Sequence, residues 1–324
     1  MSSRSYSRRT WARPSTSLQL ESLEARYLLS SPGSLPSGGV NHLVAGSGSS
    51  LIALTPQHVL YRHTDAGGWT ALGQNVLAAS ASAEKSGNVV VFALTSDHAL
   101  GRYDPVSGWQ MIGGSGTIQS ISSGTDQNGR ADVFVLTTGG SFTEYTSSSG
   151  WSTGGLPGSG PILSWDATNG NAVVAVTTNH QILEHNDQFG WFPLSGPGFA
   201  QSVSVTNDAS SNQVVFATTP AQGLYELISG GGWTPIGSAG TIAGVSAGLD
   251  TAGQAMAAVL TTAGDLLEYD GAAGWFMVHP PGPVAQASAA MGDRIYFTLQ
   301  DGSIFGHDDT FGSFRMTSIG FAQT

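Results

Sequence analysis

The feature that most constrains this 324-residue chain is a glycine-aromatic phrase that recurs about every 40 residues. Six copies read Gly-Trp, and in the seventh a Phe follows a Ser. The aromatic residues are Trp69, Trp109, Trp151, Trp191, Trp233, Trp275 and Phe314, and the steps between them are 40, 42, 40, 42, 42 and 39 residues. Seven copies at nearly constant spacing indicate a structural repeat.

Each repeat contains four short segments of strand-like composition. In one repeat they are "TIQSISSG" (117–124), "VFVLT" (133–137), "SFTEY" (141–145) and the strand that begins at Trp151. β-Branched and aromatic residues fill these segments, and Gly, Asn, Asp and Ser turns such as "DQNG" (126–129) separate them. Four antiparallel strands in 40 residues are typical of a propeller blade, which must pack its two faces on neighbouring blades. The aromatic residue of each repeat, Trp in six and Phe in the seventh, supplies a large apolar surface for such a contact.

We therefore predict an all-β fold, a seven-bladed β-propeller of four-stranded antiparallel blades, over residues 38–324. A disordered, targeting leader and linker over 1–37 precedes it. Segment 38–46 supplies the first strand and segment 314–320 the last. Six blades plus a decayed unit are the alternative. The composition agrees, because 45 Gly and only 10% charged residues suit short strands joined by tight turns.

Charge and cysteine content exclude several classes of protein. Residues 1–26 hold five of the 11 basic and two of the 22 acidic residues, so the remainder carries a net charge of −14. Such a surface repels phosphate backbones, so we expect no nucleic-acid partner. The chain has no Cys, which excludes disulfides and thiol catalysis. No apolar run is long enough for a transmembrane helix.

The N-terminal segment differs from the repeats. It is basic and Ser-rich, contains Arg8-Arg9, and lacks the apolar core of an ordinary signal peptide. The stretch "LQLESLEARYLL" (18–29) resembles the Leu-Glu-x-Arg-x-Leu-Leu motif in front of exported proteins of planctomycete bacteria, with Ala25 where that family usually has Pro. The resemblance implies secretion or display at the cell surface. A tail with a chance match is the alternative.

The repeats themselves also resemble known families. The Gly-Trp and Leu-Gly phrases and "ISSGTDQNGRADVFVLT" (121–137) look like repeats of exported planctomycete proteins, over about residues 38–320. They are more remotely similar to tectonin-like and fucose-binding propeller lectins, whose repeats also carry a Trp. The ligand residues of those lectins do not transfer, because their polar motif has no positional match here. The resemblance implies a lectin-like, carbohydrate-binding propeller.

Two sets of residues are candidates for binding. Exposed Trp faces stack on sugar rings, so the candidate ligand-binding residues are Trp69, Trp109, Trp151, Trp191, Trp233 and Trp275; a core role at the blade boundary is the alternative. Asp126, Asn128 and Asp132 in the "DQNGRAD" segment form a weak calcium candidate, because oxygen ligands alternate there. The alternative is a hairpin turn, since the terminal Glu of a complete calcium loop is absent.

Two further columns come from the third strand of each repeat. One charged column reads Arg62, Arg102, Glu144, Glu184, Glu226 and Glu268. We expect a solvated strand end there, with Arg102 and Glu144 facing each other across a blade boundary. The next position holds His63, His185 and His307, with Tyr in three other repeats, which indicates a packing or surface position.

The sequence contains no Ser-His-Asp order, zinc motif or P-loop, so we predict no catalytic residue and no cofactor. The leading hypothesis is an exported, non-enzymatic binding or display module that recognises glycans or a surface protein. One alternative is a hydrolase or lyase with acidic residues at the central channel. The other is a structural domain without a ligand.

Overall fold

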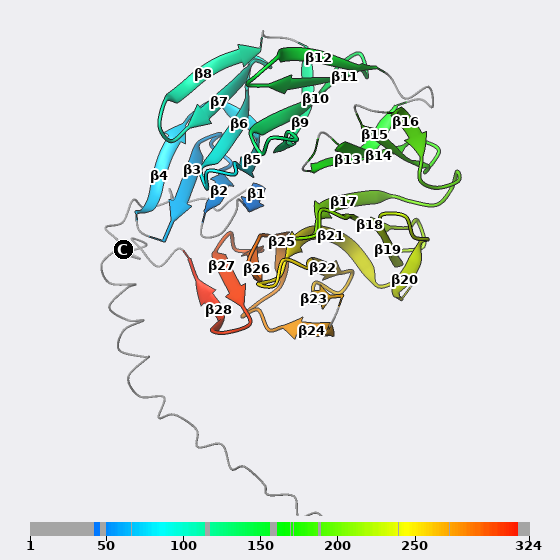
Figure 1. The fold of residues 1–324 in the computed structure, drawn as a ribbon. Helices are drawn as coiled ribbons and strands as arrows, with labels where there is room; N and C mark the ends of the chain where they lie inside the picture. The colour runs from blue at the N-terminus through cyan, green and yellow to red at the C-terminus, as the bar shows by residue number, and fades with distance from the viewer. Residues whose placement is uncertain are drawn as a thin grey trace, which may run out of the picture.

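The structure is a computed structural model that describes residues 42–45, 50–65, 67–113, 117–155, 161–168, 170, 172–186, 189–238, 240–271 and 273–316. These residues form seven four-stranded antiparallel sheets in a ring around a central axis (Figure 1). They contain no helix. The predicted seven-bladed propeller is confirmed, and the six-bladed alternative is wrong. The predicted leader, 1–37, lies outside the described residues.

Each blade consists of four consecutive strands, the first nearest the axis and the fourth at the rim (Figure 1). The strands of blades 1 to 4 are β1 (His42–Ala45), β2 (Leu51–Leu54), β3 (Leu60–Thr64), β4 (Gly68–Gly73), β5 (Val76–Ala83), β6 (Val89–Thr95), β7 (Leu100–Asp104), β8 (Gly108–Gly113), β9 (Ile118–Thr125), β10 (Ala131–Thr137), β11 (Phe142–Thr146), β12 (Gly150–Gly155), β13 (Ile162–Thr168), β14 (Ala172–Thr177), β15 (Ile182–Asn186) and β16 (Gly190–Pro193). The strands of blades 5 to 7 are β17 (Ser202–Asn207), β18 (Gln213–Thr218), β19 (Leu224–Ile228), β20 (Thr234–Gly237), β21 (Ile242–Leu249), β22 (Ala255–Thr261), β23 (Leu266–Asp270), β24 (Gly274–Val278), β25 (Val284–Ala289), β26 (Arg294–Leu299), β27 (Ile304–Asp308) and β28 (Gly312–Arg315).

The second strand of each blade is buried on both faces, which explains its almost continuous apolar composition. Successive side chains of a strand point to opposite faces of the sheet. In blade 2, Phe92 and Leu94 therefore pack against Val133 of blade 3, whereas Val91 and Ala93 pack against blade 1. One such cluster lies at each of the seven blade boundaries. The ring holds together because each blade covers the next.

In five of the blades, the indole N–H of the repeated Gly-Trp phrase donates to the preceding blade of the ring. The indole N–H of Trp109 in β8 donates to the carbonyl oxygen of Leu72 in blade 1 at 2.7 Å, and its ring lies over Gly73. The same bond runs from Trp69 to Met316, from Trp151 to Ile112, from Trp233 to Leu194 and from Trp275 to Ile236. A phrase such as "GWTALG" therefore serves two boundaries: its Trp binds the preceding blade, and its Leu-Gly end receives the next Trp.

Hydroxyl groups connect the innermost strands around the axis. Ser80 Oγ accepts the backbone N–H of Ser123 at 2.9 Å, and Ser204 Oγ accepts that of Ala247 at 3.0 Å. The edge of an innermost strand would otherwise leave backbone N–H groups without partners. These bonds satisfy them and fix the spacing of neighbouring blades at the channel.

The ring closes between blade 7 and blade 1 without an exchanged strand among the described residues. The N–H of Leu43 in β1 donates to Gln286 Oε1 in β25 at 3.1 Å. At the rim, the Trp69 N–H donates to the Met316 carbonyl oxygen at 3.2 Å. Leu43 and Trp69 also share an apolar cluster with Tyr296 of blade 7. Among the described residues, side chains rather than a shared sheet therefore make this closure.

Candidate functional site

The six candidate Trp residues lie at the rim of the ring, at or beside the start of the outer strands. Trp69 is only 4% exposed and presents no open ring face. Exposure is 41%, 43% and 39% for Trp109, Trp151 and Trp275, and Trp191 and Trp233 are half-buried. The indole N–H bonds between blades fit the alternative interpretation, a core role at the blade boundary. Part of each ring except that of Trp69 nevertheless remains accessible to solvent.

Three of these Trp residues line hollows between adjacent blades. Trp151 lines a hollow of about 300 Å³ between blades 2 and 3. Trp191 lines one of about 190 Å³ between blades 3 and 4, and Trp233 lines one of about 770 Å³ between blades 4 and 5. Asn186 lines the last two. The structure therefore gathers candidate aromatic rings and concave surface along one arc of the rim.

The hollow at Trp191, which we call the blade 3–4 hollow, combines aromatic and polar side chains. Blade 3 contributes them from β11 and β12, and blade 4 from β15 and β16. Its lining includes Phe142, Glu144, Ser152, His185, Asn186 and Trp191. Ligand sites in proteins have this character, with apolar and aromatic walls and a few polar groups that orient the ligand.

Aromatic contacts hold the Trp191 ring in place. Its centroid lies 5.2 Å from that of Phe142 and 5.1 Å from that of His185, both in tilted arrangements. Phe142 also contacts Trp165 edge to face at 5.1 Å. The other six repeats place Leu or Ile at the position of Phe142, so this aromatic wall is particular to the blade 3–4 boundary. Such contacts fix the orientation of the ring.

Polar groups surround this aromatic wall. Ser152 Oγ donates to Glu144 Oε2 at 3.4 Å, and Asn186 Oδ1 accepts the N–H of Phe189 at 2.9 Å. Asn186 Nδ2 lies 3.5 Å from Glu184 Oε1. Carboxylate, amide and hydroxyl groups are thereby placed beside the Trp191 face, on strands rather than on loops. This arrangement can accept and donate hydrogen bonds to a small polyhydroxylated ligand.

A second buried carboxyl group lies near Glu144. Asp132 in β10 is fully buried; its Oδ1 accepts the N–H of Gly124 at 3.0 Å, and its Oδ2 has no hydrogen-bond partner. Burial, and then the neighbouring Glu144 charge, raises the pKa of Asp132 to about 8. The protein therefore favours a protonated Asp132 at neutral pH, which reduces the negative charge next to Glu144.

The calcium candidate residues have other roles in the structure. Asp126 Oδ1 accepts the N–H groups of Asn128 at 2.8 Å and Arg130 at 2.9 Å, so its carboxylate closes the β9–β10 hairpin. Asn128 is exposed, whereas Asp132 is buried against Gly124. These bonds are those of the hairpin turn that was the alternative interpretation.

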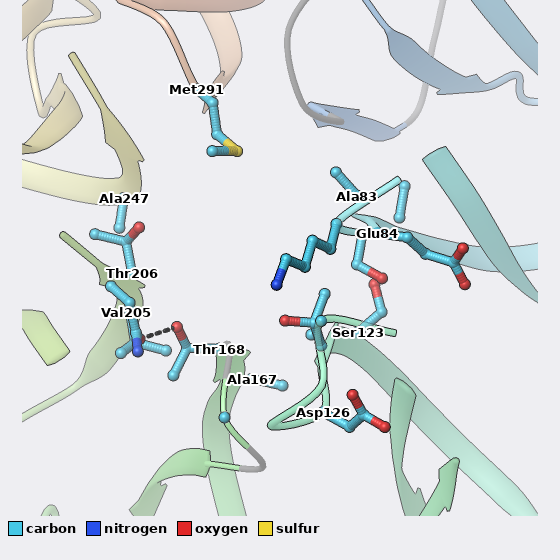
Figure 2. A pocket seen from close by; sticks show the side chains of 18 of the residues that line it. Ala83, Glu84, Ser123, Asp126, Ala167, Thr168, Val205, Thr206, Ala247 and Met291 are labelled. Atoms are coloured by element: carbon cyan, nitrogen blue, oxygen red, sulfur yellow. Dashed lines mark hydrogen bonds between the residues drawn. The ribbon is translucent and has the colours of Figure 1, made fainter. Parts of the chain in front are cut away.

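The central channel is the place where the enzyme hypothesis puts acidic residues. A cavity of about 900 Å³ opens there, lined mainly by Ala, Ser, Gly and Thr from the innermost strands (Figure 2). Glu84 and Asp126 lie in its wall, but their carboxylates point away from its centre (Figure 2). Glu84 Oε1 lies 3.4 Å from Arg102 Nη2, and Asp126 closes its own hairpin. These two carboxylates are thus engaged in structural contacts.

The structure corrects the interpretation of the charged column. Arg102 does not face Glu144: it pairs with Glu84 at 3.4 Å and Asp104 at 3.2 Å in its own blade. Residues of this column face the next blade, as shown by Glu226 of blade 5, which accepts the Tyr269 hydroxyl of blade 6 at 3.5 Å. The column is therefore a boundary position rather than a solvated strand end.

This geometry brings together residues that the sequence left in separate columns. The charged column of one blade meets the His/Tyr column of the next, so Glu144 meets His185 and Glu268 meets His307. The sequence did indicate that these positions are structurally equivalent, because the charged column and the His/Tyr column recur with the same period. The two columns could be paired only after the direction in which each strand faces was known.

Comparison with known proteins agrees with the fold. No protein-family model and no curated protein sequence matches the chain. The BP39L lectin from Burkholderia pseudomallei superimposes with a TM-score of 0.61 at 17% identity, covering 83% of this chain and 95% of the lectin. YCF48, solved bound to a D1 peptide, gives 0.59 at 13% identity, covering 85% and 94%.

PorZ, a bacterial surface component of the type-IX secretion system of Porphyromonas gingivalis, gives a TM-score of 0.59 at 10% identity, covering 88% of this chain and 38% of PorZ. At these identities the likeness establishes the propeller fold alone. The part of the chain that the structure describes contains no helix long and apolar enough to span a membrane.

Proposed function

We propose that this protein is a non-enzymatic binding module that recognises a glycan in the blade 3–4 hollow. The observation that carries the proposal is the Trp191 ring, held by Phe142 and His185 beside Glu144 and Asn186. A flat aromatic face suits the C–H surface of a sugar ring, and the carboxylate and amide suit its hydroxyl groups. The fold shared with a lectin supports the same class of ligand.

The size of the hollow supports a small ligand. Its volume of about 190 Å³ is below the roughly 300–1,000 Å³ typical of pockets for drug-sized ligands. A single sugar ring at the end of a glycan fits this expectation. The adjacent blade 4–5 hollow shares Asn186, so a second ring of the same glycan can extend along the rim.

A glycan array followed by calorimetry with the bound glycan tests the proposal. We expect Trp191→Ala and Glu144→Gln each to weaken binding at least tenfold, about 1.4 kcal/mol. Trp109→Ala is the matched control, because Trp109 has the same place in its repeat but lies outside the hollow; it should change affinity less than about twofold. Folding of each variant is checked by circular dichroism. The absence of any bound glycan, or an equal loss in the control, contradicts the proposal.

The proposal includes two statements about context. The leader-like stretch 18–29 supports export or surface display, which fractionation of the producing cells tests. The protein should leave the cytoplasm, and deletion of 1–37 should retain it there.

The structural roles of Glu84 and Asp126 support a module without catalysis. Mass spectrometry should therefore find the glycan intact after incubation with the protein. Cleavage of the glycan would instead support the hydrolase or lyase alternative.

A further inference from the structure

A second group of side chains lies across the boundary between blades 6 and 7, far along the ring from the blade 3–4 hollow. It consists of Glu268, His307 and Asp309, and one potential ligand atom from each lies within 4.8 Å of the others. Among the described residues, no other set of three His, Asp or Glu side chains meets this geometry. We call these three residues the blade 6–7 cluster.

Rigid elements position two of the three groups. Glu268 is the central residue of β23 and is 1% exposed, and His307 belongs to β27 of the next blade. Asp309 is in the turn that follows β27 and is exposed. Glu268 therefore lies at the buried side of the cluster, and the strand β27 positions the His307 imidazole. The Asp309 carboxylate is accessible, so an ion can enter the cluster from solvent.

The imidazole of His307 is oriented by a group outside the cluster. Its Nδ1 lies 3.1 Å from the Ser313 hydroxyl, and its Nε2 faces Asp309 Oδ1 at 3.9 Å. Metal-binding histidines commonly have one ring nitrogen hydrogen-bonded to an outer group while the other binds the metal. His307 is therefore held with the correct nitrogen toward the carboxylates.

The partners of Glu268 differ from those of other boundary carboxylates. Glu84 has the Arg102 guanidinium and Glu226 has the Tyr269 hydroxyl. Glu268 instead lies beside His307 and Asp309, and the nearby carboxyl group of Asp293 contributes to raising its pKa after burial and the charge of Asp309. Three carboxyl groups and one imidazole thus converge at this boundary, a donor set that favours a divalent cation over an organic ligand.

We propose that Glu268, His307 and Asp309 form a zinc-binding site that links blade 6 to blade 7, with Asp293 as a further carboxylate beside it. One imidazole nitrogen and carboxylate oxygens are ligands that Zn²⁺ takes at about 2.0–2.2 Å. The three ligand atoms, which lie within 4.8 Å of one another, would move closer together as they bind the ion. The site uses no residue of the blade 3–4 hollow, so it is independent of glycan binding.

Calorimetry with ZnCl₂ on the full, untagged chain, pretreated with chelator and dialysed, tests this site. We expect one Zn²⁺ per chain, with affinity lowered at least tenfold in His307→Gln and in Asp309→Asn. Asp309 is an exposed turn residue, so Asp309→Asn keeps the test meaningful if His307→Gln does not fold. His185→Gln is the matched control, because His185 has the same place in its repeat beside Glu144; it should change Zn²⁺ affinity less than twofold.

Thermal unfolding distinguishes this site from general attraction of cations to an acidic protein. Zn²⁺ should raise the Tm of the native chain and of the His185→Gln control, and should raise it much less in His307→Gln. Ca²⁺ at the same concentration should have little effect, because it does not favour imidazole. Unchanged Zn²⁺ affinity in both cluster variants, equal loss in the control, or equal stabilisation by Ca²⁺ would overturn the proposal.

Discussion

Asp132 shows how strongly one residue can depart from its repeat. The corresponding positions of four other repeats hold Val90, Ala172, Val214 and Met256, yet this blade buries a carboxyl group there. Burial, and then the charge of Glu144, raises its pKa to about 8. A group whose pKa is raised by folding stabilises the native state below its unfolded pKa, and this stability is lost as the pH rises through the folded pKa.

We therefore predict that Asp132→Asn stabilises the protein at alkaline pH. Asn resembles the protonated carboxyl group, so the gain should be on the order of 2 kcal/mol near pH 8 and should shrink toward pH 5, where Asp132 is protonated in the native state. Urea unfolding of both proteins across this range measures the difference. A gain that is independent of pH would show that Asp132 is not the titrating group.

Asp104→Asn is a control of opposite sign. The backbone N–H of Val106 and then that of Ser107 and the Arg102 guanidinium lower the pKa of Asp104. Its contribution to stability is therefore present above the unfolded pKa and lost as the pH falls. Asp104→Asn should destabilise the protein at neutral pH, with an effect that shrinks in acid.

At the scale of elements, the turns between second and third strands contain a contact between blades. His58, His98 and His180 each adopt a positive φ of 59–62° in these turns. Each ring Nδ1 bonds to a carbonyl oxygen of the next blade, and that of His98 lies 2.7 Å from Ile118 O. The corresponding turns of blades 3, 6 and 7 have Gly140, Gly264 and Gly302 at this position, also with positive φ.

We predict that His98→Ala destabilises the protein by about 1–2 kcal/mol, because it removes this bond and leaves a Cβ at a left-handed position. His98→Gly should recover part of the loss, since Gly adopts positive φ without strain. Chemical denaturation measures both, with the exposed His279→Ala as a control that should change little. Equal stability of the Ala and Gly variants would show that backbone strain at the positive φ does not contribute to the loss of stability.

The elements also show what a sequence of this kind reveals. Strand number, order and the buried second strand follow from the period, because each repeat must cover its neighbour. The aromatic wall at Phe142 and the Glu268–His307 contact do not follow from it. They depend on which face of one blade meets which face of the next, and a column in the sequence records position along a strand but not its partner across a boundary.

At the scale of the whole molecule, ring closure is the contact between the most distant parts of the chain. The Trp69 bond to Met316 joins residues 247 positions apart, whereas the Trp109 bond to Leu72 joins residues 37 apart. Closing a longer loop costs more chain entropy. In the described part of the chain, side-chain contacts such as the Trp69 bond to Met316 offset this cost at the boundary between blades 7 and 1.

This arrangement predicts unequal effects of one substitution at equivalent positions. Trp69→Phe leaves a carbonyl oxygen without its donor at a site where the ring is 4% exposed, so it should cost about 1–3 kcal/mol. Trp109→Phe should cost less than about 1 kcal/mol, because Trp109 is 41% exposed and water can reach the Leu72 carbonyl oxygen. Thermal unfolding measures stability, and limited proteolysis of the chain ends measures opening of the ring. If both variants lose the same stability and are cleaved at the same rate, closure is no weaker than an internal boundary, and the ring behaves as seven equivalent contacts.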